Sequence, residues 1–111
     1  MKLAEQACKP VQAGVAPLSR KDTGELSQEI PKWSLSDKSI QREYRFKDFR
    51  QAMNFVNNVA SIANEQDHHP DIFISYNKVR LLLSTHKIEG LSLNDFIMAA
   101  KIDLLMVLTD M

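Results

Sequence analysis

All three histidines of this 111-residue chain fall in one short region, at His68, His69 and His86. An imidazole has an ordinary pKa of about 6.5, so near neutral pH it can both donate and accept a proton. A cluster of imidazoles therefore suits a reaction that needs an acid at one substrate atom and a base at another. The clustering predicts general acid and base chemistry as the first functional hypothesis.

A predicted β-hairpin positions these histidines. Two segments rich in strand-forming residues, 71–75 and 78–84, flank the dipeptide Tyr76-Asn77. Asparagine tolerates positive φ, so we expect a tight turn there, with Ser75 paired to Lys78.

The register of that hairpin brings the imidazoles together. Extending it past the strand ends places His68 opposite Thr85, whereas a turn one residue later places His69 opposite His86. Pro70, directly after the histidine pair, biases His69 toward extended backbone. In either register the three imidazoles gather at one end of the hairpin.

Other roles for the histidines stay open at this point. His68 and His69 could instead cap the preceding helix, because positive charge is favourable at a helix C-terminus and His-Pro is a common helix stop. A metal site built from Asp67 and the three histidines is disfavoured. Adjacent histidines point in different directions, and no thiolate lies nearby in the sequence.

Asp95 also has two open interpretations. With Ser92 it resembles a capping box that opens the last helix, where its charge favours the helix dipole. Alternatively it orients His86 by accepting the second imidazole N–H, which fixes the tautomer. A nucleophilic triad of Ser84 or Ser92 with His86 and Asp95 is disfavoured, because the sequence has no nucleophile elbow.

The hydrophobic periodicity predicts the order helix, two strands, helix, two strands, helix. These elements cover about residues 19–30, 33–35, 40–46, 47–64, 71–75, 78–84 and the segment after 92. The inward stripes of the second and third helices are predicted as Phe49, Ala52, Met53, Val56, Val59, Ala60 and Ala63, and as Leu93, Phe96, Ile97, Ala100, Leu104 and Val107. Residues 1–18 lack periodicity and are expected to form a loosely ordered N-terminal arm, before a single domain over residues 19–111.

Composition excludes several classes of protein. The mass of 12.7 kDa fits one domain. Lysine plus arginine equals aspartate plus glutamate, which disfavours direct binding of nucleic acid. The three scattered glycines form no dinucleotide or phosphate loop, and no apolar run is long enough to span a membrane. The single cysteine, Cys8, excludes an internal disulfide and is expected to be inert. The first residues do not resemble a secretion signal, so a cytoplasmic protein is expected.

One family combines these features. The residues His68-His69-Pro70, Tyr76, His86 and Asp95, in this spacing, resemble the signature of the pterin-4a-carbinolamine dehydratases. The flanking segments 76–79, 84–86, 90–92 and 95–97 agree with that signature, and the resemblance covers about residues 31–103. One position departs from the family pattern. Asn64, beside Glu65, stands where the family often has an acidic residue that would help to bind or polarise the substrate.

The resemblance implies an α+β fold, a four-stranded antiparallel sheet with helices packed on one face. It implies loss of water from 4a-hydroxytetrahydropterin to give quinonoid dihydropterin, in recycling the tetrahydropterin of aromatic amino-acid hydroxylases, with no metal or organic cofactor. By resemblance, His68 and His86 are the acid and base, His69 holds the pterin, and Asp95 supports the site. Groups near Pro70 and at Thr85, Lys87 and Ile88 meet the flat ring.

The resemblance also implies partners other than the substrate. Members of the family form dimers through edge strands and often tetramers through the long helices, so a homodimer or homotetramer is expected. Some relatives act as dimerisation partners of a transcription factor. A non-catalytic pterin-binding or protein-interaction homologue, or one serving the molybdenum pterin cofactor, is therefore the alternative to an enzyme.

Overall fold

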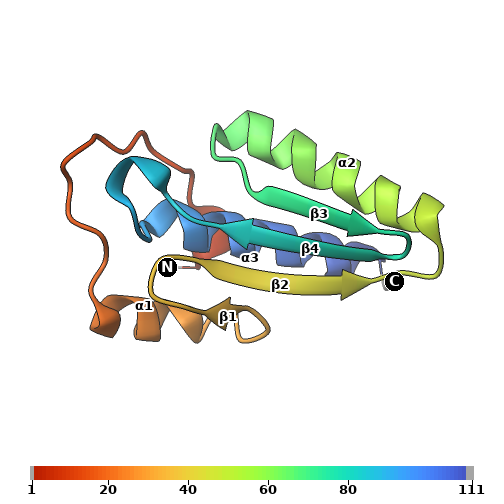
Figure 1. The fold of residues 1–111 in the computed structure, drawn as a ribbon, viewed down its shortest axis with the longest axis horizontal. Coiled ribbons are helices and arrows are strands. Elements are labelled where there is room, and N and C mark those ends of the chain that lie inside the picture. The colour runs from red at the N-terminus through yellow and green to blue at the C-terminus, as the bar shows by residue number, and fades with distance from the viewer. Residues whose placement is uncertain (1, 110–111) are drawn as a thin grey trace.

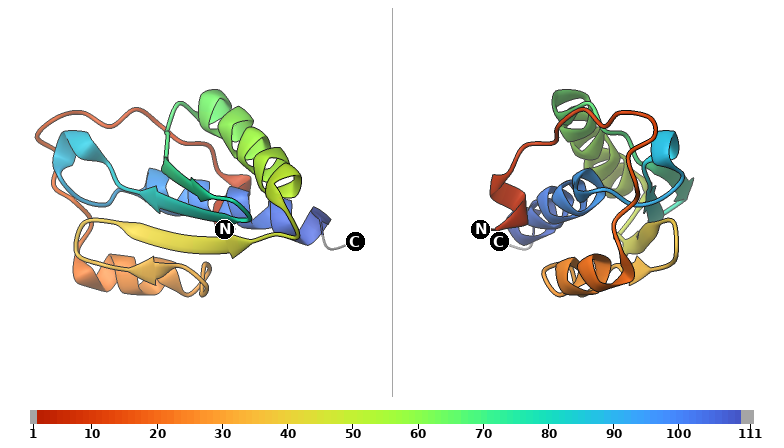
Figure 2. Two further views of the ribbon diagram at one scale, coloured as in Figure 1. Left: turned by 45° about the vertical axis from the view of Figure 1, so that its right-hand side comes forward. Right: turned by 90° about the vertical axis from the view of Figure 1, so that its left-hand side faces the viewer.

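The computed structural model describes residues 2–109, and the side chains of residues 2–106. Its centre is a four-stranded antiparallel sheet in the order β1-β2-β4-β3, with the helices on one side of it (Figures 1 and 2). The predicted fold class and element order are confirmed. The elements are η1 (Leu3–Glu5), α1 (Arg20–Ser27), β1 (Ser34–Leu35), β2 (Ile40–Arg45), α2 (Phe49–Gln66), β3 (Asp71–Ser75), β4 (Lys78–Leu83), η2 (His86–Ile88) and α3 (Leu93–Thr109).

The β3–β4 hairpin has the predicted register, with Ser75 paired to Lys78. The turn differs in one respect, because the left-handed residue is Tyr76, at φ 52°, and not Asn77. Asn77 instead ties the turn to the end of β2. Its side-chain amide donates to the carbonyl of Phe46 at 3.0 Å, and its own carbonyl accepts from the Phe46 N–H at 2.8 Å.

Helix α2 begins after Asp48, whose carboxylate accepts from the N–H of Gln51 at 2.9 Å. It ends at Gln66, two residues later than predicted, and Asp67 follows in the left-handed conformation. Most of the predicted stripe is buried or half-buried, but Phe49 is 49% exposed. Phe55, which the stripe omitted, is buried in its place against Tyr44 and Phe46.

Helix α3 is buried over more of its circumference than the predicted stripe. Leu93 and Leu104 are 39% and 50% exposed, so their prediction as core residues is wrong, and the side chain of Val107 lies outside the described residues. Its fully buried apolar residues, within the described side chains, are Phe96, Ile97, Met98, Ala99 and Ile102. The physical reason is that α3 packs against α2 and also against η1 of the N-terminal arm, so a single stripe is too narrow.

A polar cluster joins α3 to β2 and to Trp33, the residue before β1. Oδ1 of Asp103 accepts from Trp33 Nε1 at 2.9 Å, Arg42 at 2.7 Å and the Tyr44 hydroxyl at 2.9 Å. The guanidinium of Arg42 also lies 4.3 Å from the centre of the Tyr44 ring. Burial, reinforced by the charge of Asp103, raises the pKa of Tyr44 well above its usual value, so this phenol serves as a neutral donor.

The N-terminal arm runs along α3 before it turns toward α1 (Figure 1). Leu3 in η1 is fully buried, and the ammonium of Lys101 donates to the carbonyl of Ala4 at 2.9 Å. The division into a loosely ordered arm and one domain stays a prediction. Within residues 2–109, no helix has the length and apolar character that a membrane crossing requires.

Candidate active site

A cavity of about 570 Å³ lies where the ends of the β3–β4 hairpin, the C-terminus of α2 and the N-terminus of α3 meet. All three histidines line it, as the hairpin register predicted. The lining residues are Cys8, Lys9, Pro10, Val11, Glu65, Gln66, Asp67, His68, His69, Ser84, Thr85, His86, Lys87 and Asn94. The cavity therefore combines several proton-transfer groups with an open surface for a small ligand.

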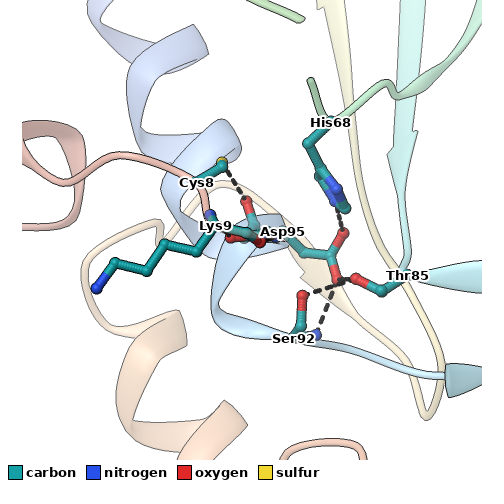
Figure 3. A network of polar contacts seen from close by, with 7 residues as sticks. Cys8, Lys9, His68, Thr85, Ser92 and Asp95 are labelled. Carbon is teal, nitrogen blue, oxygen red and sulfur yellow. Dashed lines mark hydrogen bonds and ion pairs between the residues drawn. The ribbon is translucent and has the colours of Figure 1, made fainter. Parts of the chain in front are cut away.

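His68 contacts a buried carboxylate behind the cavity wall. Its Nε2 atom lies 2.6 Å from Oδ1 of Asp95, a side chain with no exposed surface (Figure 3). Because a carboxylate only accepts hydrogen bonds, the hydrogen of this pair sits on Nε2. The Nδ1 atom of His68 is then the ring nitrogen left for a ligand.

Asp95 is held by the loop that begins α3. Its Oδ2 atom accepts from the Thr85 hydroxyl at 2.8 Å and from the N–H of Ser92 at 3.0 Å. The hydroxyls of Thr85 and Ser92 lie 2.7 Å apart and complete the network in Figure 3. The Ser92–Asp95 capping contact is confirmed, but the interpretation that Asp95 orients His86 is wrong, since its imidazole partner is His68. Asp95 therefore both starts the helix and sets the orientation of one histidine.

Asn64, the position that departs from the family pattern, contacts one of the three histidines. Oδ1 of Asn64 lies 3.0 Å from Nε2 of the exposed His69, so the amide is a hydrogen-bond partner of that imidazole. Asn64 does not itself line the cavity, whereas Glu65 does. Glu65 is also close to its neighbour Gln66, whose amide donates to it at 3.3 Å.

His86 also lines the cavity, from the start of the single-turn helix η2. Its loop is closed by the N–H of Thr85, which donates to the carbonyl of Gly90 at 2.8 Å. A Cβ atom on Gly90 would lie 2.7 Å from Cβ of Pro17, so only glycine lets the N-terminal arm pass this close. Lys87 follows His86 along the cavity edge.

Only some of the remaining predicted site residues line the cavity. Thr85 lies at the cavity, but Pro70 and the buried Ile88 are not among its lining residues. No arrangement of three or more histidine, cysteine, aspartate or glutamate side chains among the described residues is suited to hold a metal ion.

Sequence reasoning missed one side of the cavity. Residues 8–11 of the N-terminal arm line it, and Cys8, expected to be inert, lies among them. Burial raises the pKa of the Cys8 thiol to about 11, so this side chain is a neutral thiol near physiological pH. No periodicity or motif in residues 1–18 could have revealed this placement, because the contacts join residues far apart in the chain.

Comparisons with known proteins agree with this site. A profile described as pterin 4 alpha carbinolamine dehydratase matches residues 16–105. Proteins of Halorhodospira halophila and Nitrosospira multiformis, both provisionally named pterin-4-alpha-carbinolamine dehydratases, are 44% and 47% identical. The alignments cover 95% and 93% of this chain, and 98% and 91% of the relatives.

A solved structure shares the fold as well as the sequence. The crystal structure of a transcriptional coactivator/pterin dehydratase from Brucella melitensis superposes with a TM-score of 0.76 at 32% identity. The superposition covers 80% of this chain and 97% of that one. Together with the three histidines around one cavity, these similarities show that the chain belongs to the family of pterin 4 alpha carbinolamine dehydratases, which are hydro-lyases.

Proposed function

We propose that this protein removes water from 4a-hydroxytetrahydropterin and releases quinonoid dihydropterin, within the recycling of the pterin cofactor used by aromatic amino-acid hydroxylases. The bond from C4a to the hydroxyl oxygen breaks, and that oxygen takes up a proton and leaves as water. The N5–H bond also breaks, and its electron pair forms the new C4a–N5 double bond. The reaction therefore needs one acid and one base on the same small ligand.

The buried pair of His68 and Asp95 carries this proposal. With its Nε2 hydrogen directed at Asp95, a neutral His68 offers Nδ1 as a proton acceptor. The imidazolium that forms after proton uptake is stabilised by the adjacent carboxylate, 2.6 Å away and shielded from water. We therefore assign His68 as the base that takes the N5 proton.

His86 is assigned as the acid that protonates the leaving hydroxyl. It lines the same cavity as His68 from a different element, so the two imidazoles flank the ligand. Its side chain is exposed, which allows it to recover a proton from solvent after each turnover. His69, with Asn64 as its partner, is assigned to hold the pterin. Thr85, Lys87 and Glu65 contribute the remaining polar contacts.

The test is rapid mixing of chemically generated 4a-hydroxytetrahydropterin with the protein, followed by absorbance. We expect dehydration faster than the spontaneous rate, with most of the acceleration lost in His68→Ala and in His86→Ala. Lys38→Ala, a substitution on the exposed loop between β1 and β2, is the matched control and should keep full activity. The proposal fails if folded wild-type protein gives only the spontaneous rate.

A second candidate function is protein interaction without turnover, since the Brucella melitensis relative carries the name of a transcriptional coactivator as well as a pterin dehydratase. Folded protein that binds 7,8-dihydrobiopterin yet leaves the spontaneous rate unchanged would favour this candidate. The equal numbers of acidic and basic residues argue against direct contact with nucleic acid in either role. We place the protein in the cytoplasm, where the thiol of Cys8 stays reduced.

Self-association through the sheet edge is proposed as well. Strand β3 is an edge strand, and its Phe73 and Ile74 are exposed although both are large and apolar. Unpaired backbone groups beside apolar side chains favour pairing with a second strand. Sedimentation equilibrium should give a dimer or tetramer, and Ile74→Lys should shift it toward the monomer. A wild-type monomer at micromolar concentration would contradict this assignment.

A further inference from the structure

Four residues of the N-terminal arm, residues 8–11, form one side of the candidate active site. They lie outside residues 16–105, the part of the chain that the family profile matches. Figures 1 and 2 show this segment passing the N-terminal end of α3 on its way to α1. The four residues are called the arm wall below.

The arm wall is attached to the rest of the protein by side chains of α2 and α3. The amide of Asn94 makes two hydrogen bonds with the backbone of Lys9. Its Nδ2 donates to the carbonyl at 2.6 Å, and its Oδ1 accepts from the N–H at 2.9 Å. Gln66 accepts from the N–H of Cys8 at 2.8 Å, and the Cys8 thiol lies 3.6 Å from the carbonyl of Asn94. These contacts satisfy the backbone much as a neighbouring strand would.

The attachment points adjoin the catalytic candidates in sequence. Asn94 directly precedes Asp95, and Gln66 stands two residues before His68. The arm wall therefore connects the end of α2, which His68 follows by two residues, to the start of α3, which carries Asp95. Asn94 is only 7% exposed, so both of its bonds to Lys9 are largely shielded from water.

The chemistry of the arm wall suits a flat heteroaromatic ligand. Pro10 and Val11 offer apolar surface, and Cys8 offers a neutral thiol, which packs as a small apolar group. The side chain of Lys9 extends away from Asp95 and His68 (Figure 3). The charged end of Lys9 thus points away from the buried pair, and the surface that the arm wall offers beside it is apolar.

We propose that the bound pterin packs against the arm wall, and that Asn94 is the positioning residue that holds this wall in place. The proposal rests on the proposed function for the identity of the ligand. It assigns to residues 8–11 a part in substrate binding and no part in proton transfer. If the arm wall only stabilised the fold, substrate binding would not depend on its position.

The first test compares two ways of loosening the arm. Asn94→Ala removes the two hydrogen bonds that the Asn94 amide makes with the backbone of Lys9 at the cavity. Lys101→Met removes the tie to Ala4, and neither Lys101 nor Ala4 lines the cavity. We expect Asn94→Ala to raise KM for 4a-hydroxytetrahydropterin about fivefold to tenfold with kcat within about twofold, and Lys101→Met to leave both parameters unchanged. A loss of kcat at unchanged KM would instead show that Asn94 acts through Asp95, and would overturn the proposal.

The second test does not depend on turnover. Cys8 is the only cysteine, so its modification by 4,4′-dithiodipyridine reports on the arm wall directly. Saturating 7,8-dihydrobiopterin should slow this modification at least fivefold, with half of the effect at the Kd measured by calorimetry. Protection without dehydratase activity would refute the proposed function and keep the arm wall as part of a pterin-binding site. A modification rate that no concentration of 7,8-dihydrobiopterin changes would overturn the proposal.

Discussion

Asp95→Asn is the substitution that tests the buried pair most directly. The carboxylate accepts three hydrogen bonds, from His68 Nε2, the Thr85 hydroxyl and the N–H of Ser92. An asparagine has the same shape but only one acceptor oxygen. If that oxygen keeps the contacts with Thr85 and Ser92, the new NH₂ group faces His68. The imidazole must then accept at Nε2 and carry its hydrogen on Nδ1.

The expected magnitudes follow from this exchange. A charge-assisted hydrogen bond is replaced by a neutral one, which costs about 1–2 kcal/mol of unfolding free energy and leaves the fold intact. The effect on turnover is larger, because a hydrogen on Nδ1 blocks the proton acceptor assigned to the reaction. General acid and base catalysis contributes roughly a hundredfold to ten-thousandfold, and kcat should fall within that range.

Rapid-mixing kinetics and urea unfolding measure the two quantities separately. The double variant His68→Ala/Asp95→Asn is the informative comparison, since it should be no slower than His68→Ala alone if Asp95 acts through His68. An Asp95→Asn protein that folds and keeps kcat within twofold of wild type would refute the assignment of His68 as a base held by Asp95. Additive losses in the double variant would refute the coupling between the two residues.

Three further predictions concern single residues. Burial raises the pKa of Tyr44, so the neutral phenol stabilises the folded state fully below the unfolded tyrosine pKa of about 10. Above that pH the stabilisation is lost, by up to about 1.4 kcal/mol per pH unit. The free energy of urea unfolding should fall less steeply in Tyr44→Phe than in wild-type protein between about pH 10 and about pH 11. Equal slopes in the two proteins would contradict this. The rate of Cys8 modification should keep rising up to its pKa of about 11, whereas a plateau near pH 9, the ordinary thiol value, would contradict the burial. Asn64→Ala, which removes the partner of His69, should raise KM severalfold with little change in kcat. Asn64→Asp should restore KM, and an effect confined to kcat would show that His69 takes part in the chemistry.

Local features of the sequence were sufficient for the hairpin and the start of α3. A two-residue turn at Tyr76-Asn77 pairs Ser75 with Lys78, which is one of the two registers that the sequence left open. The Ser92–Asp95 capping contact is likewise confined to a few neighbouring residues. These two features, with the spacing of the histidines, were enough to predict three imidazoles around one cavity.

The errors arose where distant elements meet. Phe49, Leu93 and Leu104 have helical spacing but are exposed, because the surface that each helix buries depends on what packs against it. Helix α3 is covered by α2 and by η1, so its core includes Met98 and Ile102, which lie outside the predicted stripe.

The sequence by itself determined the element order and the end of the hairpin at which the three histidines gather, because each depends on residues close together in the chain. Only the tertiary structure decided that Asp95 faces His68 and not His86, since the packing of α3 against α2 sets which imidazole the carboxylate reaches. The tertiary structure also placed residues 8–11 at the cavity, through a tie between Lys9 and Asn94 across most of the chain. Contacts of that separation depend on how layers pack, and periodicity within one segment carries no information about them.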